Sequence, residues 1–132
     1  MAYLPNVYEI ELLLSIRIPF LQAYAAADVL LLPSDAGETW GRVVNEAMAS
    51  GRPAIVSRDV GCCEDLVIEG ETGFAFDGGD VDGLAQKMTL YLKDPALAAS
   101  QGKAAAKHIA NYGLKQAADG IIAAVNAVSR GA

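Results

Sequence analysis

The chain has 132 residues, of which 53% are hydrophobic and 20% charged, and its net charge is -6. This length suffices for one domain with a hydrophobic core, and the composition is too apolar for a disordered segment. The ten Lys and Arg residues form no basic run, so the sequence argues against nucleic acid and anionic membranes as partners.

The first elements in the chain alternate between helix and strand. Residues 19–27 predict a helix with Pro19 in its first turn, and the apolar run at 29–33 predicts a buried strand. A polar loop at 35–40 leads to a helix at 41–50 that Gly51 stops, and a second buried strand follows at 53–57. Residues 61–71 read as a loop with a helical turn around 65–68, and 73–76 as a third strand. A strand, helix and strand in succession predict a parallel crossover.

The rest of the chain reads as helical. Asp80 can cap a helix whose apolar positions recur every three or four residues, and Asp94-Pro95 starts another helix, which we expect to close at Gly113. The apolar positions of the first of these helices are Val81, Leu84, Met88 and Leu92, and a later stripe comprises Leu114, Ala118, Ile121, Ile122, Val125 and Val128. The predicted fold class is α/β: a partial Rossmann-like, three-layer domain with a small parallel sheet and a helical C-terminal half.

No leader or membrane segment is expected, because the N-terminal region lacks a basic start and charged residues interrupt its apolar stretch at 10–18. Cys62 and Cys63 are adjacent, and neighbouring cysteines rarely form a disulfide because its geometry is strained. Free thiols indicate a reducing compartment, so we expect a cytoplasmic protein.

Two glutamates flank the predicted start of the second helix. Glu38 lies in the loop after a strand, where open α/β sheets bind their ligands, and Glu46 lies one turn inside the helix. Gly41 permits close approach of a ligand, and the N–H groups that open a helix favour a phosphate. A sugar diol would supply hydrogen-bond donors to Glu46. Taken alone, however, such glutamates are more often solvated surface acids.

The segment from 33 to 53 resembles the motif of two glutamates with seven residues between them in the retaining glycosyltransferases of family 4, or group 1. The wider resemblance runs from about residue 24 to 84, whereas residues 1–19 match poorly. It rests on Ala25-Ala26-Ala27-Asp28-Val29, Pro33-Ser34, Glu46-Ala47-Met48-Ala49, Gly51-Arg52-Pro53, Gly61, Glu64-Asp65, Gly70-Glu71-Thr72-Gly73-Phe74 and Gly79-Asp80. It implies the GT-B fold, with this chain as a single domain comprising the second half of the C-terminal, donor-binding domain.

The resemblance also implies roles for individual residues. Glu38 would bind hydroxyls of the transferred sugar, Glu46 the donor ribose, and the amides from Gly41 to Val44 the diphosphate or sugar. Thr39-Trp40 replaces the commoner glycine and phenylalanine, and the indole would wall the sugar site, although a lone Trp is more often a core residue. The predicted substrate-binding residues are Glu38, Thr39, Trp40, Gly41, Arg42, Val43 and Glu46. No residue is predicted to be catalytic. The Arg42 side chain, considered by itself, is more typical of a solvated residue at a helix start than of a phosphate ligand.

No metal or cofactor is expected beyond the nucleoside diphosphate sugar itself, which is the donor substrate. Asp80-Val81-Asp82 mimics a metal motif of another glycosyltransferase fold, but its place at a helix start favours capping. His108 has no predicted metal partner and is interpreted as a surface histidine. The paired cysteines are interpreted as structural thiols in the loop on the ligand side.

The family's acceptor domain and its basic Arg and Lys pair have no counterpart here, and only residues 6–8 suggest a remnant of the preceding strand. Two hypotheses follow. The chain is a donor-binding fragment, inactive alone and active within a larger enzyme, or it is a non-catalytic module for nucleotide-sugar binding or assembly. Half a Rossmann sheet has an unpaired edge, so an upstream polypeptide or a second copy is expected to cover it. The sequence leaves the nucleotide, sugar and acceptor open, together with the oligomeric state and the origin of the fragment.

Overall fold

The computed structural model describes residues 20–35 and 37–129. Its elements in chain order are α2 (Phe20–Ala26), β1 (Leu30–Leu32), α3 (Arg42–Ala49), β2 (Ala54–Ser57), α4 (Cys63–Leu66), β3 (Gly73–Phe76), α5 (Val81–Lys93), α6 (Pro95–Ile109) and α7 (Leu114–Ser129). The possible strand remnant at residues 6–8 and the first residue of the predicted helix at 19–27 lie outside the described residues.

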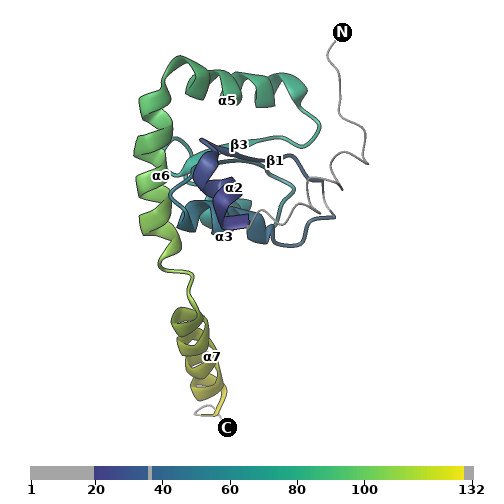
Figure 1. The fold of residues 1–132 in the computed structure, drawn as a ribbon. Coiled ribbons are helices and arrows are strands. Elements are labelled where there is room, and N and C mark those ends of the chain that lie inside the picture. Colours follow the sequence, from purple (N-terminus) through teal and green to yellow (C-terminus); the bar gives the residue numbers. More distant parts are fainter. Residues whose placement is uncertain (1–19, 36, 130–132) are drawn as a thin grey trace.

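The three strands form one parallel sheet in the order β1-β2-β3, with Leu31 opposite Ile55 and Ile55 opposite Phe74. The predicted strands are confirmed, although β1 is one residue shorter at each end and β2 begins one residue later than expected. Figure 1 shows α5 on one side of the sheet and α3 on the other. The predicted fold class, α/β with a small parallel sheet, is therefore confirmed.

Each face of the sheet has its own core, because successive side chains of a strand point to opposite faces. On one face, strand residues pack with α3, α4 and the later part of α6; on the other, they pack with α5 and the start of α6. The first core includes Val44, Met48, Ala54, Val56, Leu66 and Ala75, and the second comprises Ile55, Phe74, Phe76 and Tyr91. Helices on both faces of a sheet give the predicted three layers.

The two aspartates predicted to start helices do so. The carboxylate of Asp80 accepts a hydrogen bond from the N–H of Gly83 at 2.9 Å, and that of Asp94 accepts one from Ala96 at 3.0 Å. Pro95 occupies the first turn of α6, where its missing N–H costs no hydrogen bond. Asp80 is thus a helix cap, as the sequence predicts.

Three predicted boundaries or faces are wrong in detail. The helical turn expected around 65–68 lies earlier, in α4 (Cys63–Leu66). The Thr72 hydroxyl accepts a hydrogen bond from the N–H of Ile68 and donates one to the Leu66 carbonyl. These bonds end the helix at Leu66. Helix α6 ends at Ile109, and Gly113 instead precedes α7.

The packed face of α5 also differs from the predicted stripe. Val81 is 74% exposed and Leu92 is 79% exposed, whereas Tyr91 is the buried residue of this helix and Leu84 packs beside it. Periodicity gives the spacing of a face but does not show how much of it the sheet covers. Here Tyr91 and Leu84 pack with Ile55, Phe74 and Phe76, and the side chains of Val81 and Leu92 stay largely exposed in the described part of the chain.

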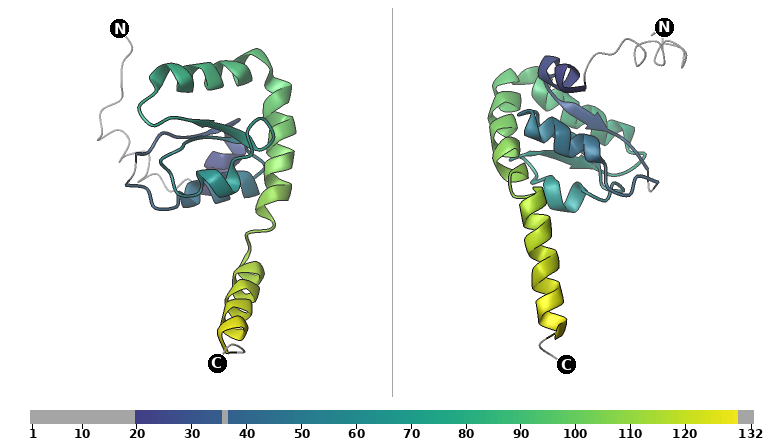
Figure 2. Two further views of the ribbon diagram at one scale, coloured as in Figure 1. Left: turned by 180° about the vertical axis from the view of Figure 1, so that it is seen from behind. Right: turned by 60° about the horizontal axis from the view of Figure 1, so that its bottom comes forward.

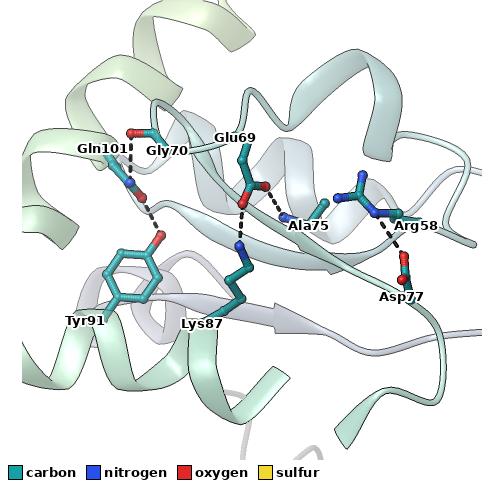
Figure 3. Close-up of polar contacts among 8 residues, drawn as sticks. All are labelled: Arg58, Glu69, Gly70, Ala75, Asp77, Lys87, Tyr91 and Gln101. Atoms are coloured by element: carbon teal, nitrogen blue, oxygen red, sulfur yellow. Dashed lines mark hydrogen bonds and ion pairs between the residues drawn. The ribbon is translucent and has the colours of Figure 1, made fainter. Parts of the chain in front are cut away.

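Polar contacts hold α5 and α6 beside β3 (Figure 3). Glu69 accepts a hydrogen bond from the N–H of Ala75 in β3 at 2.9 Å and forms an ion pair with Lys87 of α5. The hydroxyl of Tyr91 donates to Gln101 of α6, whose amide donates to a loop carbonyl. Because these groups join a loop, a strand and two helices, they fix α5 and α6 to the sheet.

Helix α7 extends away from the rest of the domain (Figure 2), and all of its residues are exposed. The predicted apolar stripe is present on it, with Leu114 92% exposed and Val128 76% exposed. Its apolar side chains are therefore not covered by the part of the chain that the structure describes. No helix among these residues has the length and hydropathy needed to cross a bilayer.

Candidate functional site

The loop after β1 is fastened by Glu38. One oxygen of this half-buried carboxylate, Oε1, accepts a hydrogen bond from the N–H of Gly41 at 3.0 Å and a longer one from Trp40 at 3.4 Å. Glu38 therefore takes the place of a capping side chain, since Gly41 has none. The sequence predicted that the Gly41 amide would be free for a ligand, and in this structure Glu38 occupies it.

Gly41 is required by the geometry of the turn. Its φ of 88° lies in the left-handed region, and a Cβ built there would lie 2.8 Å from Val60 Cγ1 and 2.9 Å from Leu32 Cδ2. Backbone hydrogen bonds, from Cys62 N–H to the Trp40 carbonyl at 3.0 Å and from the N–H of Gly61 to the Glu38 carbonyl at 3.3 Å, join this turn to the loop after β2. Residues 38–41 are thus held against the carboxyl ends of two neighbouring strands.

The opening of α3 presents N–H groups to solvent. The N–H of Val44 donates to the carbonyl of Gly41 at 2.9 Å, but within residues 20–35 and 37–129 nothing accepts from the N–H groups of Arg42 and Val43. Unpaired N–H groups and the helix dipole make such an end favourable for an anion. Arg42 has an exposed side chain, and Thr39 beside the turn is also exposed.

Trp40 is half-buried and packs against the core beside α3. Its indole Nε1–H donates to Asn45 Oδ1 at 2.8 Å, which fixes the ring over the first turns of the helix. The sequence left a core position and a wall of the sugar site as alternatives for this residue. The structure shows packing against the core together with partial exposure, and it identifies Asn45 as a partner that the sequence did not reveal.

Glu46 lies one turn inside α3 and is 38% exposed. Its Oε2 accepts a hydrogen bond from the hydroxyl of Tyr24 at 2.8 Å, and its Oε1 lies 3.6 Å from the Arg42 guanidinium. Beside it is a surface hollow of about 460 Å³ between α3 and α6, which we call the α3–α6 hollow. The residues lining it are Asn45, Glu46, Ala49, Ala106, Ile109, Ala110 and Tyr112.

Glu38 is not among the residues that line this hollow, so this hollow does not contain both carboxylates. They are nevertheless linked through the turn. Glu38 accepts from the backbone of Trp40, and the indole of Trp40 donates to Asn45, the neighbour of Glu46 in sequence. The two acids therefore flank the start of one helix.

The paired cysteines are buried and unbridged. Burial, and secondarily the neighbouring Cys63, raises the pKa of the Cys62 thiol to about 11, and burial likewise raises the pKa of Cys63. Cys62 Sγ lies 3.9 Å from the carbonyl oxygen of Gly41. Thiols that resist ionisation are poor nucleophiles and metal ligands, so these cysteines support the turn rather than react.

Candidate metal ligands do not gather in the described residues, where no group of three or more His, Cys, Asp or Glu side chains could hold an ion. Nε2 of His108 lies 2.9 Å from the Asp65 carbonyl oxygen, and the hydroxyl of Tyr112 donates to the same oxygen at 2.9 Å. His108 therefore fastens the end of α6 to α4.

The family model for glycosyl transferases group 1 matches residues 17–108. This match is longer than the resemblance found in the sequence, which runs from about residue 24 to 84. The chain belongs to this family. It is 42% identical over 94 residues to the sulfoquinovosyl transferase SQD2 of Arabidopsis thaliana, a match that covers 69% of this chain and 18% of that protein.

Solved structures of similar proteins share the fold. Sucrose-phosphate synthase from Thermosynechococcus elongatus is 31% identical, with a TM-score of 0.69 over 83% of this chain and 27% of that one. The Anabaena protein HepE, solved in complex with UDP, is 33% identical, with a TM-score of 0.61 over 69% of this chain and 24% of that one. The chain therefore spans 18% of the length of this curated relative and 27% and 24% of the two solved chains.

Proposed function

We propose that this chain is part of the donor-binding domain of a retaining glycosyltransferase of family 4 and that it binds a nucleoside diphosphate sugar. The opening of α3 carries the proposal: the N–H groups of Arg42 and Val43 have no partner among the described residues, and they lie in sequence between Glu38, which holds the Gly41 turn, and Glu46. The HepE structures, one in complex with UDP and another with UDP-glucose, support the choice of ligand class.

Each part of the site suits one part of such a donor. The N–H groups of Arg42 and Val43 would receive the diphosphate. The oxygen of Glu38 that does not hold the turn would accept from hydroxyls of the sugar, with Thr39 and the exposed edge of Trp40 beside it. Glu46 would accept from the ribose diol, because a carboxylate forms strong hydrogen bonds with hydroxyl donors. In this arrangement Gly41 shapes the turn, and its amide serves Glu38.

The proposed donor site needs no metal ion. Helix N–H groups, the helix dipole and nearby basic side chains can stabilise the charge on a leaving diphosphate. The buried, unpaired thiols fit a reducing compartment, and we include cytoplasmic location in the proposal.

Transfer itself would need the rest of the enzyme. A retaining transfer requires the acceptor hydroxyl to be held against the anomeric carbon, and positioning of this kind contributes about 7–11 kcal/mol. We therefore propose that the chain alone binds the donor and does not turn it over. The alternative, a non-catalytic module, predicts the same binding but no activity even when the remaining domain is supplied.

Calorimetry with UDP, ADP, GDP and their glucose conjugates tests the binding function. We expect at least one nucleoside diphosphate to bind, and Glu46→Gln to weaken it by about tenfold or more, because hydrogen bonds to charged groups contribute roughly 1.5–3 kcal/mol. Glu71→Gln is the matched control, since Glu71 is an exposed acid in the loop that enters the amino end of β3, whereas α3 begins after the carboxyl end of β1. Failure of the whole panel to bind, or an equal effect of both variants, would contradict the proposal.

A second polypeptide is proposed to cover the uncovered edge of the sheet. Among the described residues β1 pairs only with β2, and a hollow of about 320 Å³ lies beside it on the α5 face. We call it the sheet hollow; it is lined by Asp28, Val29, Ile55, Met88, Tyr91, Leu92, Pro95 and Ala98. Bare edges and apolar surface of this kind favour association, either with an upstream part of the enzyme or with a second copy.

A further inference from the structure

The carboxylate of Glu46 has two unequal contacts. The hydroxyl of Tyr24 donates to Oε2 at 2.8 Å, and Tyr24 is only 9% exposed. Arg42 lies 3.6 Å from Oε1 with a side chain that is 86% exposed. A solvated ion pair at that distance is weak and leaves the guanidinium free to move, whereas a hydrogen bond from a buried ring has a fixed direction. Tyr24 therefore determines where Glu46 points.

Tyr24 is itself fixed by Arg52. The Arg52 guanidinium donates to the carbonyl of Tyr24 at 3.0 Å and to that of Ala25 at 2.7 Å, at the end of α2. A cation at this position satisfies carbonyls that the helix leaves unpaired and complements the helix dipole. The N–H of Arg52 in turn donates to the carbonyl of Ala47 in α3 at 2.9 Å. Helix α2 is thus anchored to the same helix that carries Glu46.

The direction of the Tyr24 hydrogen bond is constant near neutral pH. Burial, followed by the hydrogen bond to Glu46 and the charge of that carboxylate, raises the pKa of Tyr24 to about 12. The phenol therefore remains protonated near neutral pH and donates to Oε2 of Glu46. Among residues 20–35 and 37–129, only the exposed Arg42 lies within ion-pair distance of the other oxygen, which is left for a ligand.

We propose that Tyr24 is a positioning residue, whose hydroxyl holds Oε2 of Glu46 so that Oε1 faces the ribose hydroxyls of a bound nucleoside diphosphate. This inference rests on the proposed donor-binding function. A carboxylate whose rotamer is fixed before binding loses less conformational entropy when the ligand arrives, and this raises affinity without adding a contact to the ligand.

Tyr24→Phe is the direct test, because it removes one oxygen atom and keeps the buried ring. Calorimetry would compare the wild-type chain, Tyr24→Phe, Glu46→Gln and the double variant, using UDP, ADP, GDP and the matching 2′-deoxynucleoside diphosphates. The matched control is Tyr91→Phe, which removes a buried hydroxyl bonded to Gln101 on the other face of the sheet. Thermal melts of all variants report loss of folding separately from loss of binding.

We expect Tyr24→Phe to weaken ribonucleotide binding by about three- to tenfold, the usual range for one lost hydrogen bond. It should also reduce the preference for the ribose over the 2′-deoxyribose form. In the Glu46→Gln background the same change should alter affinity by less than about twofold, since the two residues act as a unit. Tyr91→Phe should lower the melting temperature and leave affinity and ribose preference unchanged.

Two results would overturn the inference, and they have different meanings. If the wild-type chain binds a nucleoside diphosphate and Tyr24→Phe only lowers the melting temperature, the hydroxyl is structural and the proposed function stands. If the wild-type chain binds none of the probes, the proposed function fails, and the role of Tyr24 fails with it.

Discussion

Replacing Gly41 with alanine should destabilise the domain by about 2–5 kcal/mol. The left-handed backbone costs a residue with a Cβ roughly 1–2 kcal/mol. Gly41 has a φ of 88°, and its added Cβ would lie 2.8 Å from Val60 and 2.9 Å from Leu32. Overpacking of this kind costs about 1–3 kcal/mol more. At about 4 °C per kcal/mol, the melting temperature should fall by roughly 8–20 °C.

Gly51→Ala separates the two contributions. Gly51 also has a positive φ, of 73°, but no atom lies within 4 Å of the position that its added methyl group would take. This variant should therefore be destabilised only by the strain of a left-handed backbone at a residue with a Cβ, about 1–2 kcal/mol. The decrease in unfolded-chain entropy that alanine brings is the same at both sites and cancels in the comparison.

Denaturation by heat and by urea, followed by circular dichroism and by fluorescence, measures both variants. Trp40 is the one tryptophan of the chain, and it adjoins Gly41, so its fluorescence reports directly on the turn. Folded Gly41→Ala should also bind nucleoside diphosphates more weakly than Gly51→Ala, because the shift occurs at the opening of α3. Equal losses of stability in the two variants would refute the reasoning about Val60 and Leu32.

Four further outcomes follow from the described contacts. Partial burial opposes ionisation of Glu69, but its contacts with Ala75 and Lys87 outweigh burial and lower its pKa. Glu69→Gln should therefore lower the melting temperature at pH 7, and the difference from the wild type should shrink as the pH falls through about 4 and below. A difference in melting temperature that stays constant with pH would contradict this. EDTA should leave nucleotide affinity unchanged, and a loss restored by Mg²⁺ or Mn²⁺ would contradict the metal-free site. Light scattering should detect a dimer that Leu31→Lys in β1 dissociates, whereas dissociation by Leu114→Lys instead would assign the contact to α7. The isolated chain should transfer no labelled sugar from nucleotide-sugars to acceptors, and turnover abolished by Glu46→Ala would show that it is complete.

The sequence was sufficient for features that depend on neighbouring residues. Capping by Asp80 and Asp94 uses amides two or three positions away, and the buried strands are short apolar runs bounded by turn signals. The order of strand, helix and strand then gave the parallel sheet, because a crossover of that length has one favoured arrangement. The motif around Glu38 and Glu46 likewise indicated the family.

The tertiary structure alone decided which distant groups meet. Tyr24 and Glu46 are separated by 22 positions, and their hydrogen bond exists because α2 packs beside α3. The engagement of the Gly41 amide by Glu38 depends on the path of the loop, and the burial of Tyr91 rather than Leu92 depends on how α5 packs against Ile55 and Phe74. Periodicity and capping act within a few residues, whereas burial and long-range hydrogen bonds depend on how whole elements pack, and no local pattern encodes that.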